Sequence, residues 1–263
     1  MPEINTSPVP SPLPEPPTLR YRPARFIVRL LVSLLGAGAF IDAAIMALVP
    51  ITDHRYPHLL RSSVAPQGNE EIAIIFVLAG LVLLRLLAFI LSAVMFCVWA
   101  FRANKNVRAL GVSHMRFTPG WCVIWFFVPI MSLFKPYQAI KEIYIHSNPE
   151  LSEPPRYESE SVQLVGWWWT AWIAALMFAS FSDPNAQNIS IWGSTPAQVT
   201  GILAALLAIG VVITVHRRQE RKAYLNPQLN QAFCMECNYD LRASAGETCP
   251  ECGQAIPGRG ATG

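Results

Sequence analysis

Five long stretches with almost no charged residues constrain this chain more than any other feature. They cover residues 26–49, 72–101, 117–134, 162–181 and 196–215. Across the 263 residues, 52% are hydrophobic and 14% are charged, whereas soluble domains carry about 25% charged residues. A helix needs about 20 apolar residues to cross a bilayer core about 30 Å thick, and four of the stretches meet this requirement. We therefore expect an all-α membrane protein with four transmembrane helices.

The third stretch, residues 117–134, differs from the others. Pro129 lacks the backbone donor that a helix needs, and the uncharged part from Trp121 to Phe134 would span only about 21 Å. Its tryptophans are typical of the headgroup boundary. We expect a re-entrant or interfacial aromatic segment here, and a fifth crossing is the alternative. The segment contains Pro119, Gly120, Trp121, Trp125, Pro129, Lys135, Pro136 and Tyr137.

Basic residues gather at three places along the chain, and such residues next to membrane segments stay in the cytoplasm. Five crossings would put the two basic ends of the chain on opposite sides, whereas four crossings keep all three groups together. We therefore predict a multi-pass protein of the cell inner membrane with cytoplasmic N- and C-termini. The groups are Arg20, Arg22, Arg25 and Arg29; Arg102, Lys105, Arg108 and Arg116; and Arg217, Arg218, Arg221 and Lys222.

The segments on either side of the third stretch have apolar residues at helical spacing. Residues 101–110 and 137–144 both predict amphipathic helices that lie at the inner membrane surface. For the first segment, an ordinary helix in a cytoplasmic loop is an equal alternative.

Two charges, Asp42 and Arg85, lie well inside apolar stretches, where charges are costly and are candidates for a function. In antiparallel helices both would lie on the outer side of the midplane, at depths that differ by roughly 5 Å. We predict an intramembrane ion pair that clamps the first two helices together. A part in a substrate or proton path, and no contact at all, are the alternatives.

The strongest chemical motif is Cys234-x2-Cys237-x11-Cys249-x2-Cys252. Each Cys-x-x-Cys turn can direct two thiolates at one metal ion, and two such turns complete a tetrahedral shell. With four cysteines and no open position, the motif predicts a structural zinc ion, with iron or a redox dithiol pair as alternatives. Thiolates also favour a reducing compartment, which agrees with a cytoplasmic C-terminus.

Several further motifs together resemble a known bacterial membrane family, the one called domain of unknown function 4328. They are the run from Trp99 to Leu110, the turn Arg116-Phe-Thr-Pro-Gly-Trp121, the dipeptide Val128-Pro, the segment Lys135-Pro-Tyr-Gln-Ala-Ile-Lys-Glu142, and Gly166-Trp167-Trp168. The resemblance covers roughly residues 70–222 and implies an architecture but no activity. The C-terminal module resembles the short Cys-x-x-Cys ribbons appended to many bacterial proteins, with Asn238 in place of glycine.

These features divide the chain into a disordered Pro-rich N-terminus (1–23), a membrane helical domain (24–222), a linker (223–233), a zinc ribbon (234–256) and a disordered tail (257–263). The net charge of +3 gives no indication of nucleic-acid binding. No catalytic motif is recognisable, so we expect a non-enzymatic scaffold whose partners are the lipid bilayer and a protein bound through the ribbon. A small-molecule transporter or channel that uses the aromatic segment, Asp42 and Arg85 is the alternative.

Overall fold

The protein was analysed as a computed structural model that describes residues 21–61, 66, 68–112, 114–149, 162–181 and 191–225. Near the C-terminus it also describes residues 234, 236, 237, 239, 241, 244 and 246–256. Of the segments predicted to be disordered, residues 1–20 and 257–263 lie outside these residues, as does most of the predicted linker, whereas residues 21–23 are described and Tyr21 is buried. The helices are α1 (Arg25–Arg55), α2 (Pro57–Arg61), α3 (Asn69–Ala109), α4 (Pro119–Ile124), η1 (Met131–Leu133), α5 (Lys135–His146), α6 (Gln163–Phe181) and α7 (Ile191–Leu225).

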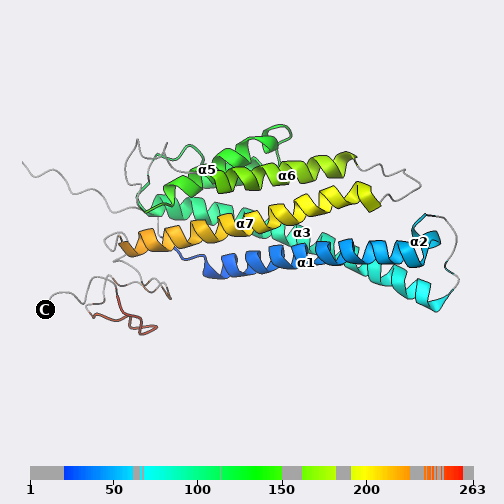
Figure 1. Ribbon diagram of the computed structural model, residues 1–263. Helices are drawn as coiled ribbons and strands as arrows, with labels where there is room; N and C mark the ends of the chain where they lie inside the picture. Colours follow the sequence, from blue (N-terminus) through cyan, green and yellow to red (C-terminus); the bar gives the residue numbers. More distant parts are fainter. Residues whose placement is uncertain are drawn as a thin grey trace, which may run out of the picture.

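The described part of the chain is all-helical and contains no strand, only an isolated bridge between Thr248 and Ala255. Four long helices lie side by side: α1 and α6 run in one direction, and α3 and α7 run in the other (Figure 1). Helix α7 packs against both α1 and α6, and α1 also packs against α3.

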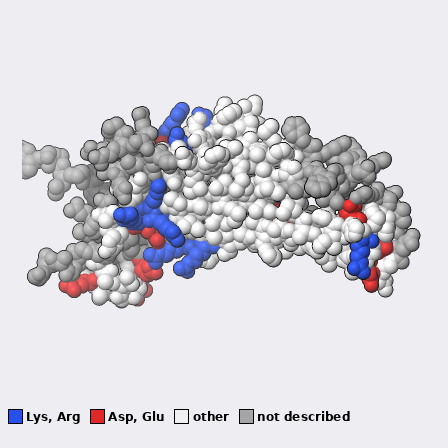
Figure 2. Space-filling view, viewed as in Figure 1, with Lys and Arg blue, Asp and Glu red and all other residues white. Residues whose placement is uncertain are grey.

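Three of these helices are long and apolar enough to cross a membrane, namely α1, α3 and the part of α7 from Pro196 to Leu225. Large apolar side chains such as Val82, Leu83 and Leu86 are exposed along α3, as expected when lipid is the solvent. Figure 2 shows the result as an uncharged band between two charged ends. Helix α6 has 19 residues and is not one of the three, so its crossing stays a prediction.

The main apolar core lies at one end of the bundle. It is formed where α1 begins, α3 ends, α6 begins and α7 nears its end, and it contains Leu31, Trp99, Val165 and Val211. We call this end the basic end, because all three basic groups meet there: Arg25 contacts Glu220 of α7, and the backbone of Arg22 contacts Asn106 of α3. Towards the other end, α1 and α3 share only a small cluster around Ile41, Ile45 and Ala88.

The prediction of a separate surface helix over residues 101–110 was wrong. Helix α3 continues without a break to Ala109, because no proline or glycine lies between Leu81 and Ala109. Its last turns are buried in the bundle, including the polar residues Asn104 and Asn106. The separate helix predicted after the aromatic segment does form, as α5. Helix α7 extends to Leu225, so the predicted linker begins three residues too early.

Buried polar groups at the basic end are joined through Gln219 of α7. Its amide nitrogen donates to the Ala103 carbonyl at 3.0 Å and to the Ser147 hydroxyl at 3.1 Å, and its oxygen accepts from Asn106 at 3.4 Å. One side chain therefore connects α7 to α3 and to the C-terminal end of α5. Because Gln219 is only 2% exposed, water cannot replace these partners.

The substitution Gln219→Ala should lower the free energy of unfolding by about 2 kcal/mol, since it leaves buried groups without partners. Arg217→Ala, two residues away at an exposed position, should change it by less than about 0.5 kcal/mol. Thermal unfolding of the two variants in detergent would measure the difference. Equal stability of the two variants would show that Gln219 does not join the helices.

Candidate metal centre and aromatic hairpin

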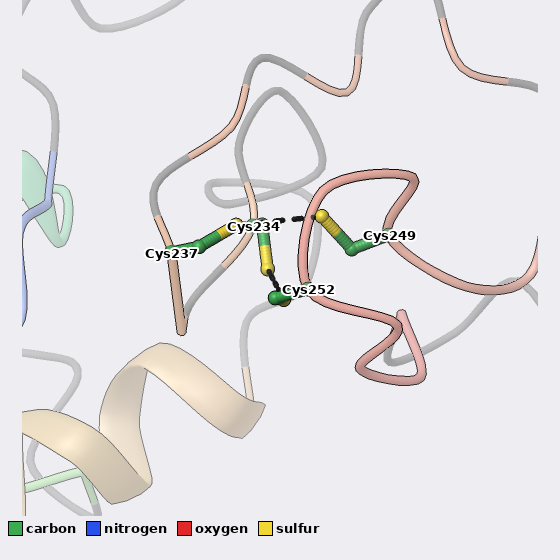
Figure 3. A group of neighbouring side chains, drawn as sticks. All are labelled: Cys234, Cys237, Cys249 and Cys252. Carbon is green, nitrogen blue, oxygen red and sulfur yellow. Dashed lines mark hydrogen bonds between the residues drawn. The ribbon is translucent and has the colours of Figure 1, made fainter.

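The four predicted cysteine ligands come together in space. Their sulfur atoms all lie within 4.8 Å of one another, and all four thiols are free (Figure 3). Cys234 and Cys252 approach to 3.5 Å between sulfurs, as do Cys237 and Cys249. In a tetrahedral shell with metal–sulfur bonds of about 2.3 Å, sulfur atoms lie roughly 3.8 Å apart. The cluster therefore has the size that a single metal ion requires.

Two similar turns hold the cysteines. The backbone N–H of Cys234 donates to the Tyr239 carbonyl and that of Cys249 to the Gln254 carbonyl, both at 2.8 Å and both across five residues. In the second turn Gly253 has a φ of +70°, which favours glycine, and its N–H donates to the Cys249 carbonyl. Asn238, the corresponding position of the first turn, lies outside the described residues.

The second turn also favours the thiolate form of Cys249. Burial raises the pKa of this thiol, but hydrogen bonds from the backbone N–H groups of Cys252 and Glu251 and from the thiols of Cys237 and Cys234 bring the pKa to about 7. Thiolates are the form that binds metal, so part of the ligand set is prepared at neutral pH.

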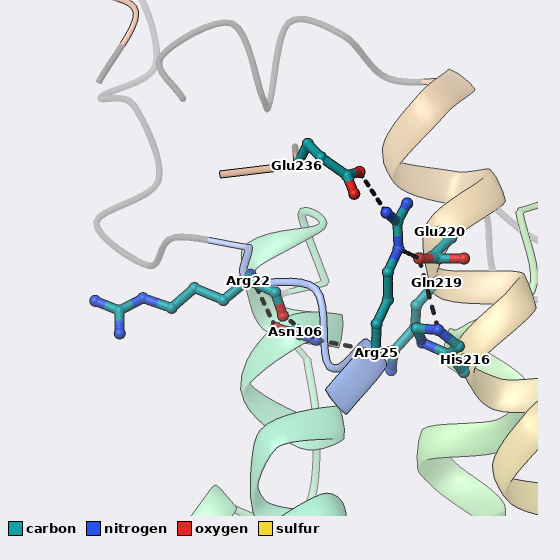
Figure 4. Close-up of polar contacts among 7 residues, drawn as sticks. All are labelled: Arg22, Arg25, Asn106, His216, Gln219, Glu220 and Glu236. Atoms are coloured by element: carbon teal, nitrogen blue, oxygen red, sulfur yellow. Dashed lines mark hydrogen bonds and ion pairs between the residues drawn. The ribbon is translucent and has the colours of Figure 1, made fainter. Parts of the chain in front are cut away.

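The cysteine module is attached to the helices through Arg25 (Figure 4). The Nε of this arginine donates to Glu220 of α7 at 2.7 Å, and its Nη1 pairs with Glu236, which lies between Cys234 and Cys237. The sequence analysis treated Arg25 only as a topology signal and missed this contact. A glutamate between two ligand cysteines was the signal available, although it does not by itself identify a partner.

The third apolar stretch leaves α3 and returns to it as a hairpin. Helix α4 begins at Pro119, is capped by the Thr118 hydroxyl and ends after Ile124. The chain then turns and enters η1 through Ile130, whose φ of +66° is unusual for a β-branched residue. Lys135 at the end of the stretch comes back beside Phe117 at its start, with the ammonium group 6.0 Å from the ring centre. The stretch therefore does not form one crossing helix.

Side-chain hydrogen bonds fix the ends of this hairpin. The Glu142 carboxylate accepts the backbone N–H groups of Arg116 at 2.5 Å and Phe117 at 3.1 Å. Asn104 donates to the Phe117 carbonyl at 3.0 Å, and Trp169 donates through its ring nitrogen to the Leu133 carbonyl at 3.0 Å. Burial raises the pKa of Glu142, an effect that the two N–H groups partly oppose.

The residues predicted for the aromatic segment differ from one another in burial and in the groups that they contact. The Trp121 and Trp125 rings lie 5.0 Å apart, and Pro136 is buried while Tyr137 packs against the core. Gly120 has open space where a side chain would stand, so nothing in the structure requires glycine there. The parts that Asn104, Glu142 and Trp169 play in holding the hairpin were not predicted from the sequence. The one sequence signal for such a contact was a polar residue on the buried face of a helix.

Asp42 and Arg85 are in contact between α1 and α3, with Arg85 Nε 2.5 Å from Asp42 Oδ1. Arg85 also lies over the Phe89 ring at 5.7 Å. Apolar residues of both helices, Ile41, Ile45 and Ala88, pack beside the pair. Asp42 lies about 25 Å along α1 from Arg25. The pair is therefore separate from the hairpin and from the cysteine module.

The helices and the cysteine cluster together define a class: a multi-helix protein of membrane type with a small module that could hold a metal ion. The chain belongs to the family described as domain of unknown function (DUF4328), whose model matches residues 67–221. The match runs from the start of α3 into the end of α7 and leaves out α1 and the cysteine module. No curated protein and no solved structure matches the chain.

The Trp169→Phe variant should loosen the hairpin, because it removes the bond to Leu133 and keeps the ring. Amide hydrogen exchange of residues 130–134 should rise roughly fivefold, the effect of about 1 kcal/mol. Trp167→Phe is the matched control, since Trp167 is 65% exposed on the same helix, and it should leave the exchange unchanged. If both variants exchange at the wild-type rate, Trp169 does not hold the hairpin.

Breaking the Asp42–Arg85 pair should destabilise the helix pair. Asp42→Asn and Arg85→Met each leave one charge without its partner, so each should cost roughly 2 kcal/mol or more. The exchanged pair Asp42→Arg with Arg85→Asp should recover at least half of that loss. The readout is the unfolding midpoint in detergent, and an exchanged pair no better than the single variants would count against a clamp.

Proposed function

We propose that this protein is a non-enzymatic scaffold of the inner membrane that presents a zinc-loaded ribbon to a cytoplasmic protein partner. The observation that carries the proposal is the contact of Arg25 with both Glu220 and Glu236. Through it, the cysteine module is held against α1 and α7 at the basic end. This contact joins the small module to the helices at the basic end, where it can bind a partner.

Zinc is the metal that best fits the cysteine cluster. Four sulfur ligands in a tetrahedral arrangement are typical of structural zinc, and no ligand position is left for substrate. The described part of the module buries only a few residues, Cys234, Leu241, Cys249 and Ile256. A core this small supplies little folding energy, so we expect metal binding to provide most of it.

We propose four crossings, by α1, α3, α6 and α7, with the basic end in the cytoplasm. Helix α6 would span about 28 Å at 1.5 Å per residue, and it carries no charge. It packs along α7, which is one of the three helices suited to cross. The positive-inside rule then gives the orientation. The hairpin after α3 keeps the number of crossings even, because it returns to its starting point.

The surroundings of Asp42 and Arg85 favour a clamp over a transport path. The pair is flanked by Ile41, Ile45 and Ala88, and the carboxylate is matched by the arginine. A paired, apolar setting stabilises one helix arrangement, whereas a transport site must accept an ion or solute. We therefore do not propose transport as a second function.

The proposal is tested by metal analysis together with crosslinking in cells. The purified chain should contain one zinc ion, which the Cys234→Ser/Cys249→Ser variant should lose and Cys97→Ser should keep. A photo-crosslinking residue at Tyr239, an exposed position of the module, should capture a discrete protein in a zinc-dependent manner. A crosslinker at Phe76, exposed on α3, is the control for general capture. Capture that is the same in the cysteine variant would contradict the proposal, as would a chain without zinc.

A further inference from the structure

The basic side chains at the basic end that have no carboxylate partner among the described residues include Arg22, Arg102 and Lys105. Arg25, in contrast, pairs with two glutamates. Arg102 and Lys105 lie one helical turn apart on α3, and the backbone of Arg22 is bonded to Asn106 on the same part of that helix. The three residues therefore bring positive charge to one place at the basic end.

The fold holds this surface together. Asn106 accepts from the backbone N–H of Arg22 at 3.2 Å and donates to its carbonyl at 3.0 Å, which fixes the segment before α1 on α3. Arg102 lies one helical turn before Asn106, so the backbone of Arg22 is held close to the part of α3 that carries Arg102. The Arg22 side chain extends away from the residues drawn with it (Figure 4). An anion bound here would be matched by positive charge from both segments.

The position of Arg102 and Lys105 along α3 indicates which anion would bind there. Arg102 is the first charged residue after the apolar run that follows Arg85, and exposed Val94, Val98 and Phe101 precede it. Lys105 lies one turn further on, with its ammonium group 4.8 Å from the Phe101 ring. The surface is thus placed where an apolar, lipid-facing helix meets the headgroup layer, and phosphate is the anion of that layer.

We infer that Arg22, Arg102 and Lys105 bind the headgroup phosphate of an anionic phospholipid. The planar guanidinium group of arginine can donate two parallel hydrogen bonds to phosphate oxygens, and the lysine ammonium group adds a compact positive charge. The bound lipid would relieve the repulsion between Arg22 and Arg102 and would hold the start of α1 beside the end of α3. This inference requires that α3 crosses a bilayer, and it does not depend on the metal or on a protein partner.

The test is native mass spectrometry of the full chain in detergent, with phosphatidylglycerol or phosphatidylcholine of the same acyl chains. The wild type should bind phosphatidylglycerol more tightly than phosphatidylcholine. The Arg22→Gln/Arg102→Gln variant should bind it roughly 30-fold more weakly, as expected for the loss of two basic contacts. The Arg217→Gln/Arg221→Gln variant loses the same amount of charge from α7, and its affinity for phosphatidylglycerol should stay within about threefold of the wild-type affinity.

Three results would overturn the inference. The first is equal binding of the two lipids by the wild type, a comparison that does not require any variant to fold. The second is an equal loss in both double variants, which would indicate a diffuse charge effect. The third is displacement of the lipid by millimolar inorganic phosphate, which would assign the surface to the free anion.

Discussion

The interior of a bilayer offers no hydrogen bonds, and this constraint organises the protein. The helices that face lipid carry apolar side chains, and the polar groups that hold them together are gathered at the basic end. Gln219 and Asn106 connect α7, α3 and the segment before α1 there, and Asn104 also binds the hairpin at this end. The Asp42–Arg85 pair is the exception, since its two charges satisfy each other within the apolar part.

Both unusual elements of the chain depend on the same end. The hairpin is held by Glu142 of α5, Asn104 of α3 and Trp169 of α6, so three helices determine its shape. The cysteine module contacts the bundle through Arg25, which also contacts α7. A change in the packing of α1 against α7 would therefore alter the position of the module. This connection gives a physical reason for joining a small cysteine module to an apolar helical bundle.

The sequence was sufficient for features that follow from a strong local rule. Apolar runs identified the long helices, Cys-x-x-Cys spacing identified the cysteine cluster, and Pro129 indicated that the third stretch does not continue as a helix. Contacts between distant residues could not be predicted in the same way. Arg25 and Glu236 are separated by 211 residues, and no pattern connects them. The continuation of α3 through residues 101–110 was missed because amphipathic spacing does not distinguish a surface helix from a buried end.

The central claim is that the chain crosses the membrane an even number of times and keeps both termini on the cytoplasmic side. Reporter fusions test it most directly. A fluorescent protein that matures only in the cytoplasm should be bright at either terminus, and alkaline phosphatase, active only outside the cytoplasm, should be inactive at both. Phosphatase fused after Arg61, just past α2, should be active and serves as the control. Active phosphatase at one terminus and a bright fluorescent protein at the other would contradict the account.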